Sequence, residues 1–171
     1  MKGQTMGVQQ TDQLLGIARA IMKEADYCFF MSHGESSEIN ARLMHPFEPD
    51  AEFNLWLGAS PNSRKVREVL KQKNVTLAFL NPRSTAYVTI IGTAALDSNP
   101  ELKRKYWRSY WSDMYPGGPD ADDYILIKVI PERVEFMNFA NAALPQPYSL
   151  KPNGLQRRNG VWSEIEARDL L

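Results

Sequence analysis

The chain has almost no cysteine and almost no histidine. Cys28 is the only cysteine in 171 residues, which excludes an internal disulfide and a cysteine-rich metal site. Because Cys28 stands in the apolar run Tyr27–Ser32, we expect it to be a small buried hydrophobic residue and not a nucleophile. The two histidines, His33 and His45, lack the spacing of metal ligands, so we expect no metal site.

Long apolar runs and an excess of one charge are also missing. No signal-peptide pattern stands near the first residues, and no apolar run approaches the length of a membrane span. Lys+Arg and Asp+Glu balance at 20 each, so no overall basic field would attract nucleic acid. The 43% hydrophobic content argues against disorder. We therefore expect a cytoplasmic globular protein with neither a membrane nor a nucleic acid as partner.

Repeats, linkers and the common catalytic motifs are absent too. We expect one domain over residues 1–171, in which residues 1–10 and 139–171 are less regular tails. No G-x-G-x-x-G occurs and helices do not alternate regularly with strands, which disfavours a Rossmann sheet. No paired carboxylates and no histidine–nucleophile arrangement stand out, so no catalytic residue can be assigned.

What the chain does contain is a series of strand patterns joined by short turns. Apolar and alternating runs predict strands at Tyr27–Ser32, Ile39–Met44, Phe53–Leu57, Val75–Leu80, Ala86–Leu96, Tyr124–Ile130 and Arg133–Asn138. We expect Pro131-Glu132 to turn the last two strands into a hairpin, and Gly92 to mark a bulge or a close backbone approach. The fold should be mainly β (α+β), a small barrel of six or seven mostly antiparallel strands with peripheral helices.

Periodic apolar residues predict three helices. They cover Asp12 to about Glu24 with Thr11 as N-cap, a helix from about Ser63, and Glu101–Met114. We expect the aromatic stripe of the third helix, which includes Trp111, to pack in a core or at an interface, with flavin stacking as an alternative. Near the end of the chain, Asn159-Gly160 predicts a tight turn, and Val161-Trp162 should pack on the core or on a second subunit.

The stretch Phe53–Gln72 is the most informative. A strand breaks at Gly58-Ala59-Ser60-Pro61-Asn62, and a helix starts with Ser63, Arg64 and Lys65. Free backbone N–H groups and the positive end of the helix dipole lie in this first turn. Two cations there are a mild electrostatic mismatch that a bound dianion would offset. The pattern therefore predicts a phosphate site, against the alternative of an ordinary capped helix.

The ordered set of patterns resembles a known family. The quoted segments are Ala41-Arg42-Leu43-Met44, the Ser63-Arg64-Lys65 helix start, Val88-Thr89-Ile90-Ile91-Gly92-Thr93-Ala94, the exit Tyr115-Pro116-Gly117-Gly118-Pro119 and Leu126-Ile127-Lys128-Val129-Ile130-Pro131. Together they are similar to the pyridoxamine 5′-phosphate oxidase-like split barrels that bind FMN. Within that superfamily they are most similar to the bacterial general stress proteins.

The resemblance implies a split β-barrel homodimer with FMN at the interface. It assigns the flavin phosphate to Arg42, Ser63 and Lys65, with Arg64 and the preceding turn at Ser60 as further candidates. Segment Arg42–His45, including Leu43 and Met44, would run beside the isoalloxazine ring and offer it backbone groups. Tyr87 falls where the oxidases place a polar residue near the flavin.

Two departures argue against a true pyridoxamine phosphate oxidase. The C-terminal Arg-x-His of the oxidases is missing, and Phe47 lies where the oxidases carry a lysine. We therefore expect an FMN-dependent oxidoreductase of the stress-protein type, reduced by a nicotinamide cofactor or another donor. The alternatives are a non-enzymatic flavin- or phospho-ligand-binding stress or sensor protein, and a barrel that binds haem or a deazaflavin.

Overall fold

The computed structural model describes residues 2–139, 152–166, 169 and 170. Within these ranges, eight strands form one antiparallel sheet in the order β2-β1-β4-β5-β6-β7-β8, and β3 joins it by pairing with β6. The strands are β1 (Cys28–His33), β2 (Ile39–Met44), β3 (Leu55–Ala59), β4 (Asn74–Asn81), β5 (Ala86–Asp97), β6 (Ile125–Asn138), β7 (Asn153–Arg158) and β8 (Val161–Ile165). The helices are α1 (Lys2–Ala25), α2 (Arg64–Lys71), α3 (Pro100–Lys105) and the 3₁₀ turn η1 (Ser109–Asp113).

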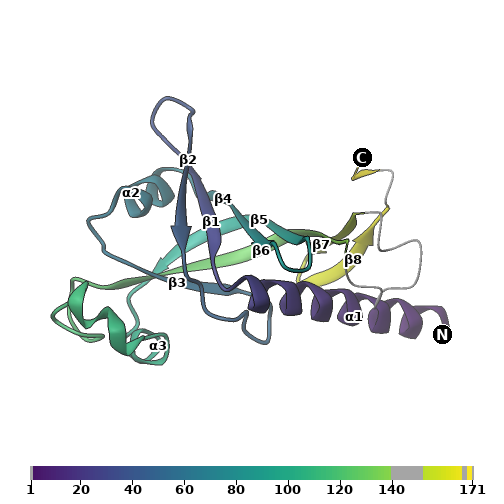
Figure 1. The fold of residues 1–171 in the computed structure, drawn as a ribbon, viewed down its shortest axis with the longest axis horizontal. Helices are drawn as coiled ribbons and strands as arrows, with labels where there is room; N and C mark the ends of the chain where they lie inside the picture. The colour runs from purple at the N-terminus through teal and green to yellow at the C-terminus, as the bar shows by residue number, and fades with distance from the viewer. Residues whose placement is uncertain (1, 140–151, 167–168, 171) are drawn as a thin grey trace.

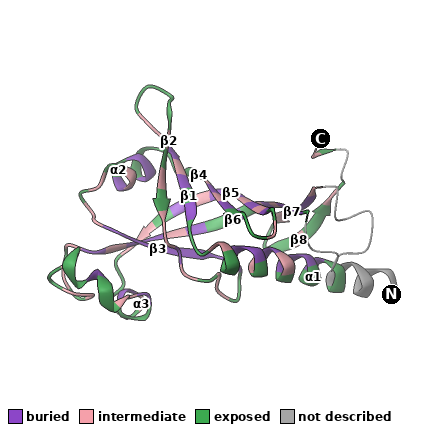
Figure 2. Cartoon of the chain, viewed as in Figure 1, coloured by how far each residue is buried: buried purple, intermediate pink, exposed green. Residues whose placement is uncertain are grey.

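The helices lie around the sheet (Figure 1). Helix α1 runs along one side of the sheet and contacts β4, β5 and β8, while α2 lies on β1 and β5. The side of α1 that faces the strands is buried and the opposite side is exposed (Figure 2). Leu14, Ala18 and Ile21, which recur at the spacing of one helix face, are fully or almost fully buried. The prediction of a mainly β, antiparallel fold with peripheral helices is confirmed, with eight strands instead of six or seven.

Strand β6 is the longest strand and joins the two halves of the sheet. It pairs with β5 along one edge, and its other edge is divided between β3 and β7. The predicted hairpin at Pro131-Glu132 is therefore wrong, because both predicted strands belong to the one continuous β6. Pro131 has no N–H to donate to a neighbouring strand. It is tolerated because it pairs with Gly92 at the bulge, where the β5–β6 register shifts and not every backbone N–H is needed for strand pairing. The bulge predicted at Gly92 is confirmed.

The predicted helix Glu101–Met114 is shorter than its aromatic periodicity indicates. Helix α3 ends at Lys105, Arg108 has extended backbone angles, and η1 follows. Tertiary contacts override the helical pattern here. Arg108 donates to the carbonyl oxygen of Pro46 at 2.8 Å and lies 4.4 Å from the centre of the Phe47 ring.

The two ends are more regular than predicted. Helix α1 already includes residues 2–10, so Thr11 is an interior helix residue and not an N-cap; these residues contain no proline to stop a helix. Near the C-terminus, β7 and β8 form a hairpin around Asn159-Gly160, whose positive φ angles confirm the predicted tight turn. Residues 140–151, 167, 168 and 171 of the predicted irregular tail lie outside the described residues.

Smaller differences concern strand boundaries and packing. The strand predicted at Phe53–Leu57 is β3 at Leu55–Ala59, because Phe53 has a positive φ of 66° and belongs to the preceding turn. Trp162 packs edge-on against Phe53, with ring centres 5.9 Å apart. The core alternative predicted for Trp162 is therefore confirmed.

Candidate functional site

The junction between β3 and α2 forms the centre of the candidate site. A turn begins at Ser60, whose carbonyl accepts a hydrogen bond from the N–H of Ser63 at 3.0 Å, and α2 starts at the next residue. Ser63 occupies the N-cap position with extended backbone angles, but its side chain makes no capping hydrogen bond. Its hydroxyl oxygen is buried and has no hydrogen-bond partner among the described residues. A buried hydroxyl without a partner is costly, which points to a ligand as its partner.

Lys65 and Arg42 bring two cations to this junction from different elements. Burial, and then the positive charge of Arg42, lower the pKa of the Lys65 ammonium. Arg42 projects from β2, and its side chain is 18% exposed. No carboxylate among the described residues forms an ion pair with Lys65. Two neighbouring cations, one of them poorly solvated and unpaired, form a site that favours an anion.

The structure thus places two residues predicted for the phosphate, Ser63 and Lys65, at the start of α2, and a third, Arg42, near Lys65. Arg64 starts α2, is mostly exposed, and pairs with Glu68 one turn later at 3.4 Å. Together with the N–H groups of the first helical turn, which lack partners within the helix, these residues could hold a phosphate group. The site fits the phosphate predicted from the helix start.

Of the residues that follow Arg42 on β2, Leu43 and Met44 point to opposite faces of the sheet. Leu43 is 62% exposed on the outer face, and Met44 packs against the core. His45 directly follows the strand, and both of its ring nitrogens have partners: Nδ1 lies 2.8 Å from the hydroxyl of Tyr110, and Nε2 lies 2.8 Å from Oδ1 of Asp26. The ring also stacks on Tyr27 at 4.6 Å. This network fixes His45 and links the end of β2 to α1 and η1.

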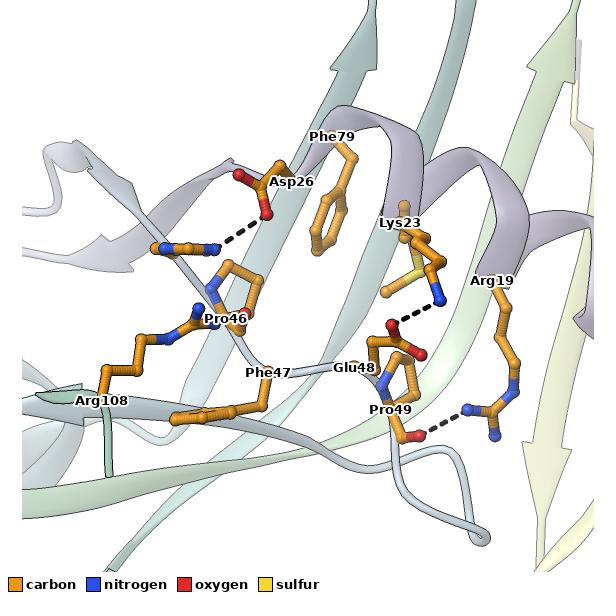
Figure 3. A pocket seen from close by; sticks show the side chains of 11 residues that line it. Arg19, Lys23, Asp26, Pro46, Phe47, Glu48, Pro49, Phe79 and Arg108 are labelled. Atoms are coloured by element: carbon orange, nitrogen blue, oxygen red, sulfur yellow. Dashed lines mark hydrogen bonds and ion pairs between the residues drawn. The ribbon is translucent and has the colours of Figure 1, made fainter. Parts of the chain in front are cut away.

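A pocket of about 290 Å³ adjoins His45. Figure 3 shows Arg19 and Lys23 on one side of it and Arg108 on the other, with the Pro46–Pro49 loop between them. Arg19 donates to the carbonyl oxygens of Pro49 and Asp50, so this arginine clamps the loop. Because His45 lies three residues beyond Arg42, about 10 Å along the strand, β2 connects this pocket to the phosphate site.

Two predicted residues lie apart from this arrangement. Tyr87 is the second residue of β5. Strands β1 and β4 lie between β5 and β2, so three strand spacings, about 14 Å, separate β5 from β2 within one chain. Trp111 is 5% exposed, and its ring packs against the rings of Phe47 and Tyr124. It also lies directly against Gly58, where a Cβ atom would be 2.6 Å from the Trp111 ring. The contacts of Trp111 are those of a second hydrophobic core, as the packing interpretation predicted.

Sequence reasoning missed Glu68 and Ser32. Both are buried and both bond Arg42: Ser32 Oγ accepts from Arg42 Nη1 at 2.5 Å, and Glu68 Oε2 accepts from Arg42 Nη2 at 2.7 Å. The only sequence signal was an acidic residue between Val66 and Val69, on the helix face that turns toward the sheet. Leu70, the apolar residue that follows Val69, is by contrast 68% exposed.

Cys28 fits its predicted role as a core residue. Burial raises the pKa of its thiol to about 12, so the thiolate nucleophile is suppressed at neutral pH. Within the described part of the chain, no group of three or more His, Cys, Asp or Glu residues could hold a metal ion. The described helices also include none that is long and apolar enough to cross a membrane.

Comparison with solved structures shows the fold. General Stress Protein 26 from Bacillus anthracis is 19% identical, with a TM-score of 0.61 over 70% of this chain and 89% of that one. A pyridoxamine 5′-phosphate oxidase-related, FMN binding protein from Nostoc punctiforme is 13% identical, with a TM-score of 0.68 over 88% and 94%. PhzG from Burkholderia lata, in complex with tetrahydrophenazine-1-carboxylic acid, is 11% identical, with a TM-score of 0.64 over 92% and 90%. The predicted split-barrel fold is confirmed.

Comparison of the sequence with families shows the relationship. No curated protein matches the chain in sequence. The family model described as "Pyridoxamine 5'-phosphate oxidase like" matches residues 16–150, which is most of the chain. The predicted resemblance is therefore confirmed, and the chain belongs to the pyridoxamine 5′-phosphate oxidase-like family.

Proposed function

We propose that this protein is a cytoplasmic flavoprotein that binds FMN and acts as an oxidoreductase. One observation carries the proposal: Arg42 lies near enough to Lys65 for its charge to lower the pKa of Lys65, and Ser63, at the start of the same helix as Lys65, has a buried hydroxyl with no partner among the described residues. Family membership and the printed name of the Nostoc punctiforme protein support FMN as the ligand. Arg42 and Lys65 would neutralise the phosphate, and Ser63 and the first N–H groups of α2 would donate hydrogen bonds to it.

From the phosphate site, the flavin ring would extend along the end of β2. The chain runs from Arg42 to His45 there, and its peptide groups could contact the ring. When bound, the flavin would supply hydride transfer, while the protein supplies binding and orientation. Asp26 and Tyr110 hold His45 in one orientation at the edge of the pocket, where substrate could approach.

The outer face of the sheet supports a homodimer. Phe29 of β1 pairs in register with Leu43 of β2, and these side chains are 51% and 62% exposed. Ile39 and Leu80, which are also exposed, extend this apolar face over β2 and β4. An exposed apolar surface that spans three neighbouring strands is typical of an interface, and we propose that a second copy of the chain covers it.

The visible spectrum tests the proposed function. We expect the purified protein to show flavin absorbance, or to acquire it with micromolar affinity when FMN is added, and NADH or NADPH to bleach it. Absence of flavin absorbance together with no micromolar FMN binding would contradict the proposal. Tight binding without reduction by any nicotinamide donor would instead assign the non-enzymatic binding role.

The pH dependence of binding tests the role of Lys65. Burial and Arg42 lower the pKa of Lys65 in the free protein, and a phosphate dianion would raise it again. Protonated Lys65 should therefore bind FMN more tightly, so the affinity should fall as the pH rises through the lowered pKa. Titrations between about pH 7 and about pH 10 check this.

Two controls make the pH test specific. Riboflavin carries the same ring without the phosphate, so its titration measures any ionisation of the flavin itself. Lys65→Arg keeps its charge over this range and should remove the decline. A constant FMN affinity in the unmodified protein would contradict a direct contact between Lys65 and the phosphate.

A further inference from the structure

A buried carboxylate lies next to the proposed phosphate site. Glu68 belongs to α2, and its side chain is only 6% exposed. Its Oε2 accepts hydrogen bonds from Ser32 Oγ at 2.6 Å and from Arg42 Nη2 at 2.7 Å, and its Oε1 accepts one from Asn40 Nδ2 at 2.8 Å. A negative charge this close to a phosphate site would repel the ligand, so its presence needs a physical reason.

The reason lies in the geometry around Arg42. Arg42 Nη1 donates to Ser32 Oγ, Ser32 donates to Glu68, and Arg42 Nη2 donates to the same Glu68 oxygen. The three side chains therefore form a closed ring of hydrogen bonds that joins β1, β2 and α2. A guanidinium has five N–H donors, and two of them are used in this ring, so others can reach a ligand.

The ring holds the arginine in one conformation before any ligand arrives. A free arginine side chain loses about 2 kcal/mol of rotamer entropy when a ligand orders it. Here Ser32 and Glu68 have already ordered Arg42, which removes that cost from binding. Burial raises the pKa of Glu68, but the hydrogen bonds from Ser32 and Arg42 outweigh it, so the carboxylate stays ionised at neutral pH.

The charges are compatible with this role. Arg42, Arg64 and Lys65 contribute three positive charges, and Glu68 subtracts one, which leaves two. A phosphate monoester carries about two negative charges at neutral pH. Glu68 therefore reduces the positive charge of the site without abolishing its complementarity to the ligand.

We propose that Glu68 is a positioning residue: together with Ser32 it fixes Arg42 in the orientation that binds the flavin phosphate. The inference rests on the proposed FMN function. It makes a prediction of definite sign, because the charge of Glu68 alone and its positioning role act in opposite directions. If charge alone mattered, removing Glu68 would tighten FMN binding. If positioning dominates, removing Glu68 weakens it.

The test is titration of Glu68→Ala and Ser32→Ala with FMN and with riboflavin. We expect both variants to bind FMN at least about tenfold more weakly and riboflavin unchanged, since only the phosphate contact depends on Arg42. Ser32→Ala removes a single hydroxyl and no charge, so it remains informative if Glu68→Ala fails to fold. Glu35→Ala is the matched control. Glu35 is an exposed acid that, like Glu68, pairs with a cation, here Lys71 at the end of α2.

A double-mutant cycle shows whether Glu68 acts through Arg42. In the Arg42→Ala background, Glu68→Ala should cause no further weakening of FMN binding. Unchanged or tighter FMN binding by both Glu68→Ala and Ser32→Ala, while the unmodified protein binds FMN, would overturn the positioning role alone. If the unmodified protein does not bind FMN, the proposed function and this inference both fail.

Discussion

Replacing Arg42 and Lys65 together with alanine should weaken FMN binding by about 3–6 kcal/mol, which is roughly two to four and a half orders of magnitude in the dissociation constant. Each substitution removes a charge-assisted hydrogen bond to the phosphate, and such bonds contribute about 1.5–3 kcal/mol each. Arg42 and Lys65 belong to different elements, β2 and α2, so neither can take over the contacts of the other. Isothermal titration of the double variant with FMN gives the ratio of dissociation constants.

The matched control removes a cation from the same helix at its far end. Lys71 closes α2, is exposed, and pairs with Glu35. Lys71→Ala should leave the dissociation constant for FMN within about twofold of the unmodified value, because exposed ion pairs contribute little. If Arg42→Ala/Lys65→Ala weakened FMN binding no more than Lys71→Ala does, the phosphate would have to be bound elsewhere.

Gly92→Ala should destabilise the protein by about 1–3 kcal/mol or more, the usual cost of forcing extra atoms into a packed site. An added Cβ would lie 2.2 Å from the carbonyl oxygen of Ile130 and 2.9 Å from Cα of Pro131. Both are backbone atoms of β6, so no side-chain rotation can relieve the overlap. Denaturant unfolding, followed by circular dichroism, measures the change in the free energy of unfolding.

Gly16→Ala is the opposite case in the same protein. Gly16 lies in α1, and no heavy atom would lie within 4 Å of an added Cβ. Because glycine is unfavourable inside a helix, alanine there should stabilise the protein by about 0.5–1 kcal/mol.

Equal free energies of unfolding for Gly92→Ala and the unmodified protein would contradict the close approach of β5 and β6 at the bulge.

Local patterns predicted most of the fold where the residues themselves determine the structure. Alternation along Ile39–Met44 and the short apolar run Val75–Leu80 gave strands close to β2 and β4, because side-chain alternation and apolar β-branched runs are strong signals. Local patterns failed where contacts with residues far away in the sequence determine the backbone conformation. The predicted helix does not continue beyond Lys105, because Arg108 is extended and contacts Pro46 and Phe47, some 60 positions earlier in the sequence.

The same distinction applies to the site. Ser63 and Lys65 were predictable because a helix start is a local signal, and Arg42 because the family resemblance assigns it. Ser32 and Glu68 were not predictable, because 36 positions separate these hydrogen-bonded partners and neither stands in a recognisable motif. Polar networks of this kind form only when the fold brings their members together.

A crystal structure of the protein with FMN bound locates the phosphate. We expect its oxygens within hydrogen-bonding distance of the Arg42 guanidinium, the Lys65 ammonium and the Ser63 hydroxyl. A phosphate bound away from all three side chains, with Ser63 still unpartnered, would contradict the proposed phosphate site.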